Sequence, residues 1–71
     1  MAIDICVRLG RRVRALRRER GWTQIYLAVH TGLNRIYISD IERGAKEPCL
    51  RTLETLADGF EIALSELMER L

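Results

Sequence analysis

TQIYLAVHTGLNRIYISDIERG, residues 23–44, is the stretch of the sequence that decides the fold. Thr23 and Asn34 are residue types that cap the N-termini of helices, so each marks the start of a short helix. Gly32 lies between the two helices and allows a tight turn, because glycine adopts positive φ at no steric cost. The stretch therefore predicts a helix-turn-helix, whose second helix enters the major groove of DNA. The two predicted helices cover residues 24–30 and 35–43.

Helical patterns continue on both sides of this unit. Apolar residues recur at helical spacing before it, and Gly21 is a suitable C-terminal stop for that helix. After it, Pro48 marks the entry to a fourth helix, and a short apolar pattern near the end predicts a fifth. Since no segment alternates with the two-residue period of a strand, we expect an all-α fold in one domain over residues 1–71. The further helices are predicted over residues 4–20, 50–58, with Leu50 facing inward, and 64–71.

Charge is distributed unevenly along the chain. Residues 8–46 hold ten arginine and lysine residues and three acidic residues, a net charge of +7. Residues 47–71 carry a net charge of −4 and Asp4 adds −1, so the whole chain is +2. The basic part favours a polyanionic partner, although a solvated arginine-rich helix with no partner explains the charge equally well.

Several other classes of protein are disfavoured. A membrane span needs about 20 apolar residues, and the apolar runs here are only a few residues long. Residues 1–4 carry no basic segment before an apolar core, so we predict no signal peptide and a cytoplasmic location. His30 is the only histidine and the two cysteines lie far apart, so no metal or cofactor is expected. Ser39 and Asp40 lack a positioned histidine, and the chain is predicted not to be an enzyme.

The order of short motifs along the chain resembles the Cro/repressor-type helix-turn-helix regulators, the Xre family. These motifs are Leu16-Arg17, Gly21-Trp22-Thr23-Gln24, Leu27-Ala28, Thr31-Gly32-Leu33, Tyr37-Ile38-Ser39, Ile41-Glu42-Arg43-Gly44 and Pro48. The resemblance implies a five-helix, lambda-repressor-like domain that regulates transcription as a dimer on a palindromic operator. The length is similar to that of the controller proteins of restriction-modification systems.

The resemblance also implies roles for individual residues. The base-reading positions hold Arg35, Ile36, Ser39 and Asp40. The positions that contact the DNA backbone hold Gln24, Asn34, Tyr37, Arg43 and Lys46. Arg17 and Glu42 stand where the family forms a structural ion pair between the first and third helices.

The chemistry of the base-reading residues fits the major groove. Arginine bonds guanine O6 and N7 together, a carboxylate accepts from cytosine N4, and isoleucine contacts the thymine methyl group. Arg35 is therefore the strongest candidate. Tyr37 is equally well explained as a residue at the edge of the core, and Asp40 as a local cap.

The C-terminal part holds more apolar residues than the end of a small core needs. We expect them to form a two-fold interface that places the two recognition helices about 34 Å apart. The alternative is that they close the core of the monomer. The residues are Phe60, Ile62, Leu64, Met68 and Leu71.

Three positions depart from the family pattern around the fourth and fifth helices. Cys49 replaces a capping serine or threonine, and Ala63 replaces the capping residue of the last helix. Glu61 stands where glycine usually ends the fourth helix, so either it adopts a strained left-handed conformation or the turn differs.

The outer face of the second helix is unusually apolar, with Ile25, Tyr26 and Val29 in place of acidic residues. The simpler explanation is loose packing, and the sharper hypothesis is an added protein interface. Such an interface would suit the DNA-binding antitoxin of a toxin–antitoxin pair, which is our alternative function. The possible protein partners are then a toxin or a polymerase.

Overall fold

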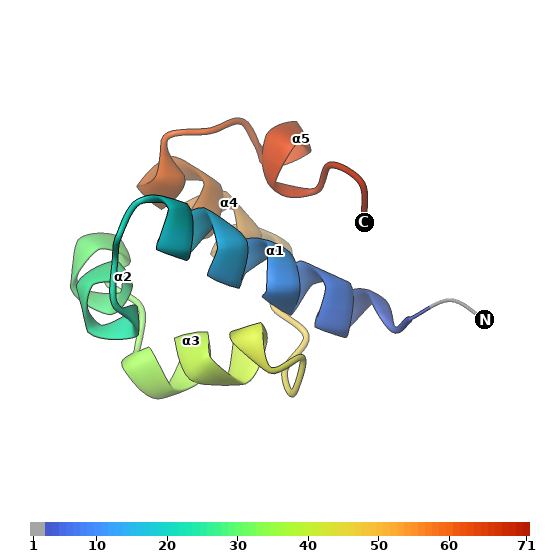
Figure 1. The fold of residues 1–71 in the computed structure, drawn as a ribbon, viewed down its shortest axis with the longest axis horizontal. Helices are drawn as coiled ribbons and strands as arrows, with labels where there is room; N and C mark the ends of the chain where they lie inside the picture. The colour runs from blue at the N-terminus through green and yellow to red at the C-terminus, as the bar shows by residue number, and fades with distance from the viewer. Residues whose placement is uncertain (1–2) are drawn as a thin grey trace.

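The computed structural model, which describes residues 3–71, contains five helices arranged around one apolar core (Figure 1). The helices are α1 (Ile5–Glu19), α2 (Gln24–Thr31), α3 (Arg35–Glu42), α4 (Leu50–Phe60) and α5 (Leu64–Leu67). No strand occurs in the described part of the chain, and the predicted all-α class is confirmed. Met1 and Ala2, which belong to the segment used to predict the absence of a signal peptide, lie outside the described residues.

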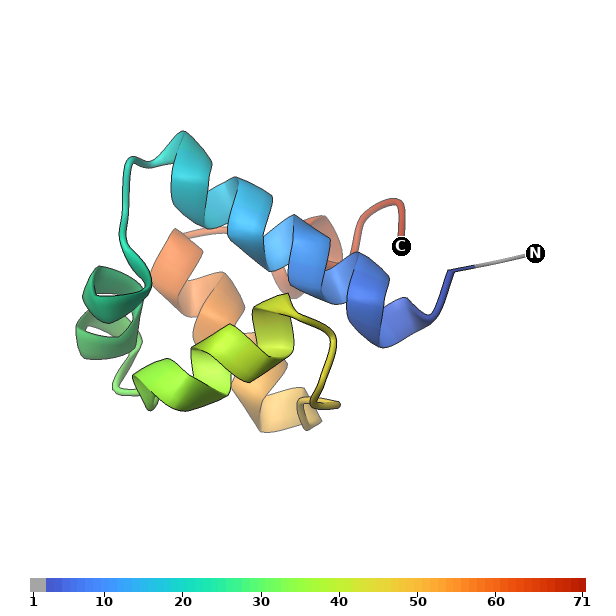
Figure 2. The same ribbon diagram turned by 60° about the horizontal axis from the view of Figure 1, so that its bottom comes forward.

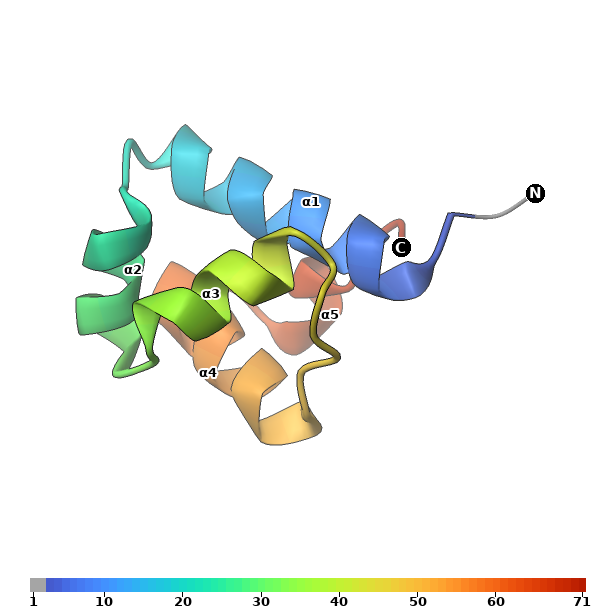
Figure 3. The ribbon, with the colours of Figure 1, turned by 90° about the horizontal axis from the view of Figure 1, so that it is seen from below.

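The longest helix, α1, extends along the middle of the molecule (Figure 1). It packs against α3, while α2 packs against both α3 and α4, and α4 packs against α5. Turning the molecule by 60° brings α3 in front of α4 (Figure 2). Seen from below, α3 lies nearest the viewer over its whole length (Figure 3). One side of α3 is therefore not covered by any other helix of the described structure.

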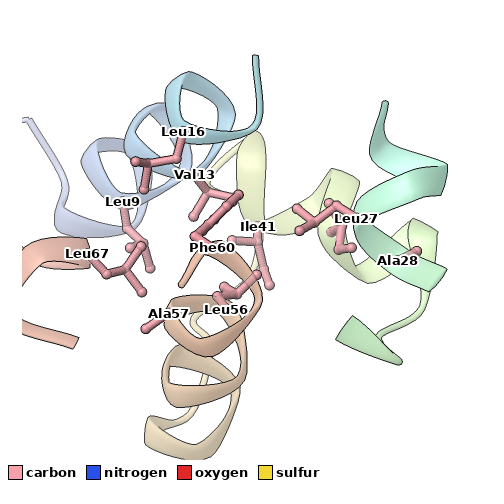
Figure 4. Close-up of a cluster of buried hydrophobic side chains, with 11 residues drawn as sticks. Leu9, Val13, Leu16, Leu27, Ala28, Ile41, Leu56, Ala57, Phe60 and Leu67 are labelled. Atoms are coloured by element: carbon pink, nitrogen blue, oxygen red, sulfur yellow. The ribbon is translucent and has the colours of Figure 1, made fainter. Parts of the chain in front are cut away.

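Eleven apolar side chains form the core, and Figure 4 shows the α1 residues facing those of α4. Each buried leucine or phenylalanine of this kind contributes about 2 kcal/mol to the free energy of unfolding through its removal from water. The inward position predicted for Leu50 is wrong, since its side chain is 69% exposed. Leu50 shares a helical face with Leu53, but it is the first residue of α4 and lies at the margin of the core.

Two glycines lie inside helices because neighbouring helices come very close there. A Cβ atom at Gly59 would lie 2.6 Å from Cγ2 of Thr31, and one at Gly10 would lie 2.4 Å from the carbonyl oxygen of Ile41. The fourth helix continues to Phe60 instead of ending near Asp58 as predicted. In α4, glycine serves a close approach to α2 and does not stop the helix.

The last helix is shorter than predicted and ends at Leu67. Arg12 Nη2 donates a hydrogen bond of 2.8 Å to the carbonyl oxygen of Glu66. Beyond Leu67, the Glu69 amide bonds to that same oxygen, three residues back, and the chain tightens into turns. As expected, Ala63 provides no side-chain cap, but its own amide donates to Glu66 Oε1 at 3.2 Å.

Glu61 ends α4 in the left-handed region, with φ +58° and ψ +41°. Its amide bonds to the carbonyl of Asp58, and the Ile62 amide bonds to that of Ala57, both at 3.0 Å. These bonds satisfy the last carbonyls of the helix, as at a glycine C-terminus. A residue with a Cβ atom pays about 1 kcal/mol or more for this conformation. The first of the two alternatives for Glu61, a strained left-handed residue, is the one that the structure adopts.

We predict that Glu61→Gly raises the free energy of unfolding by about 1 kcal/mol, because glycine adopts the left-handed conformation without the Cβ clash. Urea denaturation followed by circular dichroism measures the change. Glu61→Ala is the matched control, since it removes the carboxylate but keeps the Cβ atom, and it should give no such gain. An equal gain in both variants would show that the carboxylate, not the backbone, is responsible.

Candidate nucleic-acid interface

The helix-turn-helix is held by local hydrogen bonds at the predicted positions. Thr23 Oγ1 accepts from the Tyr26 amide at 3.0 Å, and Asn34 Oδ1 accepts from the Ile36 amide at 2.7 Å. Gly32 turns the chain between the helices with φ +78°. The two predicted caps and the predicted turn are confirmed, and they fix the start of both helices.

One face of α3 is buried and the opposite face is free. Ile38, Ile41 and Glu42 point into the molecule. The outward face carries residues spaced by three, four and seven positions, which align on one side of a helix. We call this set the outward stripe, and its members are Ile36, Ser39, Asp40 and Arg43. Ile36 is 62% exposed, and Arg35 is exposed beside it at the first residue of the helix. By their spacing and exposure, the predicted base-reading residues thus share the side of α3 opposite its buried residues.

Glu42 is fully buried and accepts hydrogen bonds from two other helices. Arg17 of α1 binds it with both ends of the guanidinium, Nε to Oε2 at 2.7 Å and Nη2 to Oε1 at 2.9 Å. Gln24 of α2 donates from Nε2 to Oε1 at 3.1 Å. Arg14 Nε also lies 3.5 Å from Oε1. The ion pair implied by the family resemblance is present, while the contact to Gln24 was not indicated by the sequence pattern.

Burial alone would favour the neutral form of the Glu42 carboxyl. The hydrogen bonds from Arg17 and Gln24, with the charges of Arg17 and Arg14, outweigh this effect and hold its pKa below the ordinary value. Arg17 also donates from Nη1 to the carbonyl of Trp22 at 2.7 Å, in the turn before α2. One buried pair therefore connects α1, the start of α2 and the end of α3.

The other predicted backbone contacts differ in their surroundings. Lys46 is exposed after α3, whereas the Asn34 side chain caps that helix. Tyr37 is half-buried against the core, and its hydroxyl lies 3.5 Å from Thr52 Oγ1. Tyr37 therefore occupies the core-edge position that was its alternative explanation.

Arg43 forms an ion pair with Asp40 within the outward stripe. Nη2 of Arg43 donates to Oδ1 of Asp40, one turn earlier on the same helix. The Arg43 side chain is 60% exposed and that of Asp40 is 19% exposed. Two residues that were predicted to contact DNA separately are thus in contact with each other.

The predicted dimer residues fall into two groups. Phe60 is only 2% exposed, and its ring stacks on Trp22 with centroids 5.9 Å apart, so it belongs to the monomer core and not to a surface. The others are half-buried at the edge of the core: Ile62, Leu64, Met68 and Leu71. Met68 also lines an apolar groove of about 190 Å³ with Ile5, Leu9 and Leu53.

The apolar face predicted for α2 is present. Val29 is 80% exposed and Ile25 is 62% exposed. Tyr26 is 49% exposed and packs its ring against Trp22, with centroids 4.8 Å apart. This is the surface that we associated with a protein partner.

Elsewhere, Cys49 gives α4 no side-chain cap, as expected. No helix within residues 3–71 is both long enough and apolar enough to cross a membrane.

A family model described as helix-turn-helix matches residues 13–67 of the chain. The chain is 42% identical over 60 residues to the immunity repressor protein of Bacillus phage phi105, covering 84% of this chain and 42% of the repressor. It spans less than half the length of this repressor and of the regulator DdrOP3 from Deinococcus deserti, which is 38% identical over 63 residues.

Solved structures of restriction-modification controller proteins share the fold. C.AhdI from Aeromonas hydrophila superposes with a TM-score of 0.84 and 37% identity, covering 87% of this chain and 94% of that one. C.Esp1396I, solved as a tetramer in complex with its natural 35 base-pair operator, superposes with a TM-score of 0.83 and 28% identity. That alignment covers 94% of this chain and 92% of that one.

We predict that Glu42→Gln lowers the free energy of unfolding by about 3 kcal/mol, because it leaves the Arg17 charge buried without a carboxylate. The folded pKa of Glu42 is depressed, so the wild type has this stability above the unfolded pKa and loses it as the pH falls. Urea denaturation between pH 7 and pH 3 should show that the free energy of unfolding falls less for the variant than for the wild type. An exposed acid on α4, changed by Glu54→Gln, is the control and should keep the wild-type pH dependence. Parallel curves for wild type and Glu42→Gln would contradict the prediction.

Proposed function

Because the chain belongs to the helix-turn-helix family of Xre-type DNA-binding transcriptional regulators, we propose that it is a sequence-specific repressor or autoregulator. It binds a palindromic operator as a homodimer. The single observation that supports this best is the uncovered side of α3, where Arg35 and the outward stripe lie together. The family consists of DNA-binding regulators and not of enzymes, and the phage phi105 relative is named a repressor.

Arg35 reads guanine in this proposal. It is exposed at the first residue of α3, the end of a recognition helix that enters the groove first. A guanidinium can bond O6 and N7 of guanine together, which no other base allows. Ile36 is next to it and suits a thymine methyl group, and Ser39 is small enough to let the helix approach the bases.

Gln24 contacts a phosphate at the start of α2. Its amide nitrogen carries two hydrogens, and one of them is used by Glu42. The contact to Glu42 fixes the side chain beside the free backbone amides of the helix N-terminus, where anions bind well. Lys46 and the basic residues of α1 add attraction to the DNA backbone that is independent of sequence and weakens with salt.

The homodimer forms through α5 and the turn before it. Ile62, Leu64, Met68 and Leu71 are half-buried in the monomer, so each still has apolar surface to cover. A two-fold axis would use the same patch on both copies and match the symmetry of a palindromic operator. The tetramer that C.Esp1396I forms on its operator supports the binding of more than one copy to DNA.

We predict that Arg35→Ala removes the guanine preference at one position in each half-site and weakens specific binding about tenfold to a hundredfold per half-site. Selection of bound duplexes from a random library, at a stated salt concentration, measures both effects. Arg18→Ala, which removes one exposed charge from α1, is the matched control and should leave every base preference intact. Unchanged base preferences in Arg35→Ala, or sequence-blind binding by the wild type, would contradict the proposed function.

We also predict that the protein is a dimer at micromolar concentration and that Met68→Glu makes it monomeric, because a carboxylate would be buried in the interface. Sedimentation equilibrium measures the mass. Val29→Glu changes an equally apolar residue on the exposed face of α2 and should remain dimeric. A wild-type monomer under these conditions would rule out the proposed dimer.

A further inference from the structure

We infer that Arg43 is a positioning residue for base readout: it holds the carboxylate of Asp40 so that Asp40 accepts a hydrogen bond from a base amino group. This revises the backbone contact that the sequence suggested for Arg43. The inference rests on the proposed function, because it requires the outward stripe of α3 to face the major groove.

The geometry of the pair favours this role. Asp40 and Arg43 lie three residues apart on the uncovered face of α3, and Arg43 Nη2 donates to Asp40 Oδ1. The carboxylate has two oxygens with about four acceptor positions, so Oδ2 stays available to a donor. The Asp40 side chain is 19% exposed, against 60% for Arg43, which means that the carboxylate is held close to the helix.

Charge gives a second reason. Asp40 is the single acidic residue among the nine that the family resemblance places against DNA. A lone carboxylate against the phosphate backbone would be repelled, and base reading by Asp40 would be opposed by the field of the DNA. Arg43 cancels this charge locally, so the pair approaches the groove as a neutral unit with an acceptor on its surface.

Pairing for stability alone is a weaker explanation. An exposed ion pair three residues apart on a helix contributes little to folding, because water screens the charges and both side chains lose freedom. The donor that fits the free acceptor best is the amino group at cytosine N4, which lies in the major groove. We therefore assign the cytosine preference to Asp40, with its orientation set by Arg43.

The experiment compares Arg43→Ala with Lys46→Ala, a second exposed cation near the end of α3, in duplex selection and in salt titration of the preferred operator. Arg43→Ala should lose the cytosine preference at the position that Asp40→Ala also loses, with about a tenfold fall in specific affinity. Lys46→Ala should keep every base preference and reduce the slope of log K against log salt by about 0.9 per protomer. Arg43→Lys, which keeps a donor, should retain part of the cytosine preference.

Two outcomes overturn the inference. Arg43→Ala with an intact cytosine preference would show that Arg43 does not position Asp40, and a slope reduced by about 0.9 per protomer would identify it as a phosphate contact. An Asp40→Ala variant with unchanged preferences would show that Asp40 reads no base. Arg35→Ala keeps these outcomes separate from the proposed function, since loss of its guanine preference supports the recognition helix whichever way Arg43 behaves. Urea denaturation of each variant confirms that the comparison is made on folded protein.

Discussion

The buried carboxylate of Glu42 is the group on which the arrangement of the first three helices depends. It lies at the end of α3 and accepts hydrogen bonds from Arg17 of α1 and Gln24 of α2. A buried carboxylate that lost these donors would cost several kcal/mol, so the three helices are stable only when all of them are in place together. The recognition helix is thereby fixed relative to the N-terminus of α2, where we propose that a phosphate binds.

A glycine on α1 makes this ion pair possible. A Cβ atom at Gly10 would lie 2.5 Å from the carbonyl oxygen of Glu42 itself, so only glycine allows α1 to approach α3 at this depth. Gly10 and Arg17 are seven residues apart and lie on the same face of α1. The face that packs closely on α3 at Gly10 therefore also brings the Arg17 guanidinium close to α3. The buried ion pair between α1 and α3 thus depends on the close packing of these two helices. The cost of a glycine inside α1 is offset by the contact it permits.

Sequence patterns predicted the features that depend on a few neighbouring residues. Thr23, Gly32 and Asn34 each act through their own turn, and the structure confirms all three. Contacts between distant segments were harder to predict from the sequence. Gly59 lies inside α4 where Thr31 of α2 comes very close, and α5 ends near the carbonyl of Glu66 that accepts from Arg12. The burial of Phe60 against Trp22 likewise depends on a contact between distant segments. The Asp40–Arg43 pair is different, because opposite charges three residues apart on a predicted helix are a local signal that could have indicated it.

The polar residues of the proposed DNA-binding face are mostly held in place before DNA arrives. The side chain of Gln24 is bonded to Glu42, that of Asn34 caps α3, and that of Asp40 is paired with Arg43. Within residues 3–71, by contrast, no hydrogen bond or ion pair involves the side chain of Arg35. Side chains that are already ordered lose little entropy on binding, so more of the cost of fixing the interface falls on exposed side chains such as Arg35 and Lys46. In the proposed complex, the paired bonds of Arg35 to guanine would offset the cost of ordering that side chain, which favours sequence-specific binding over general attraction to DNA.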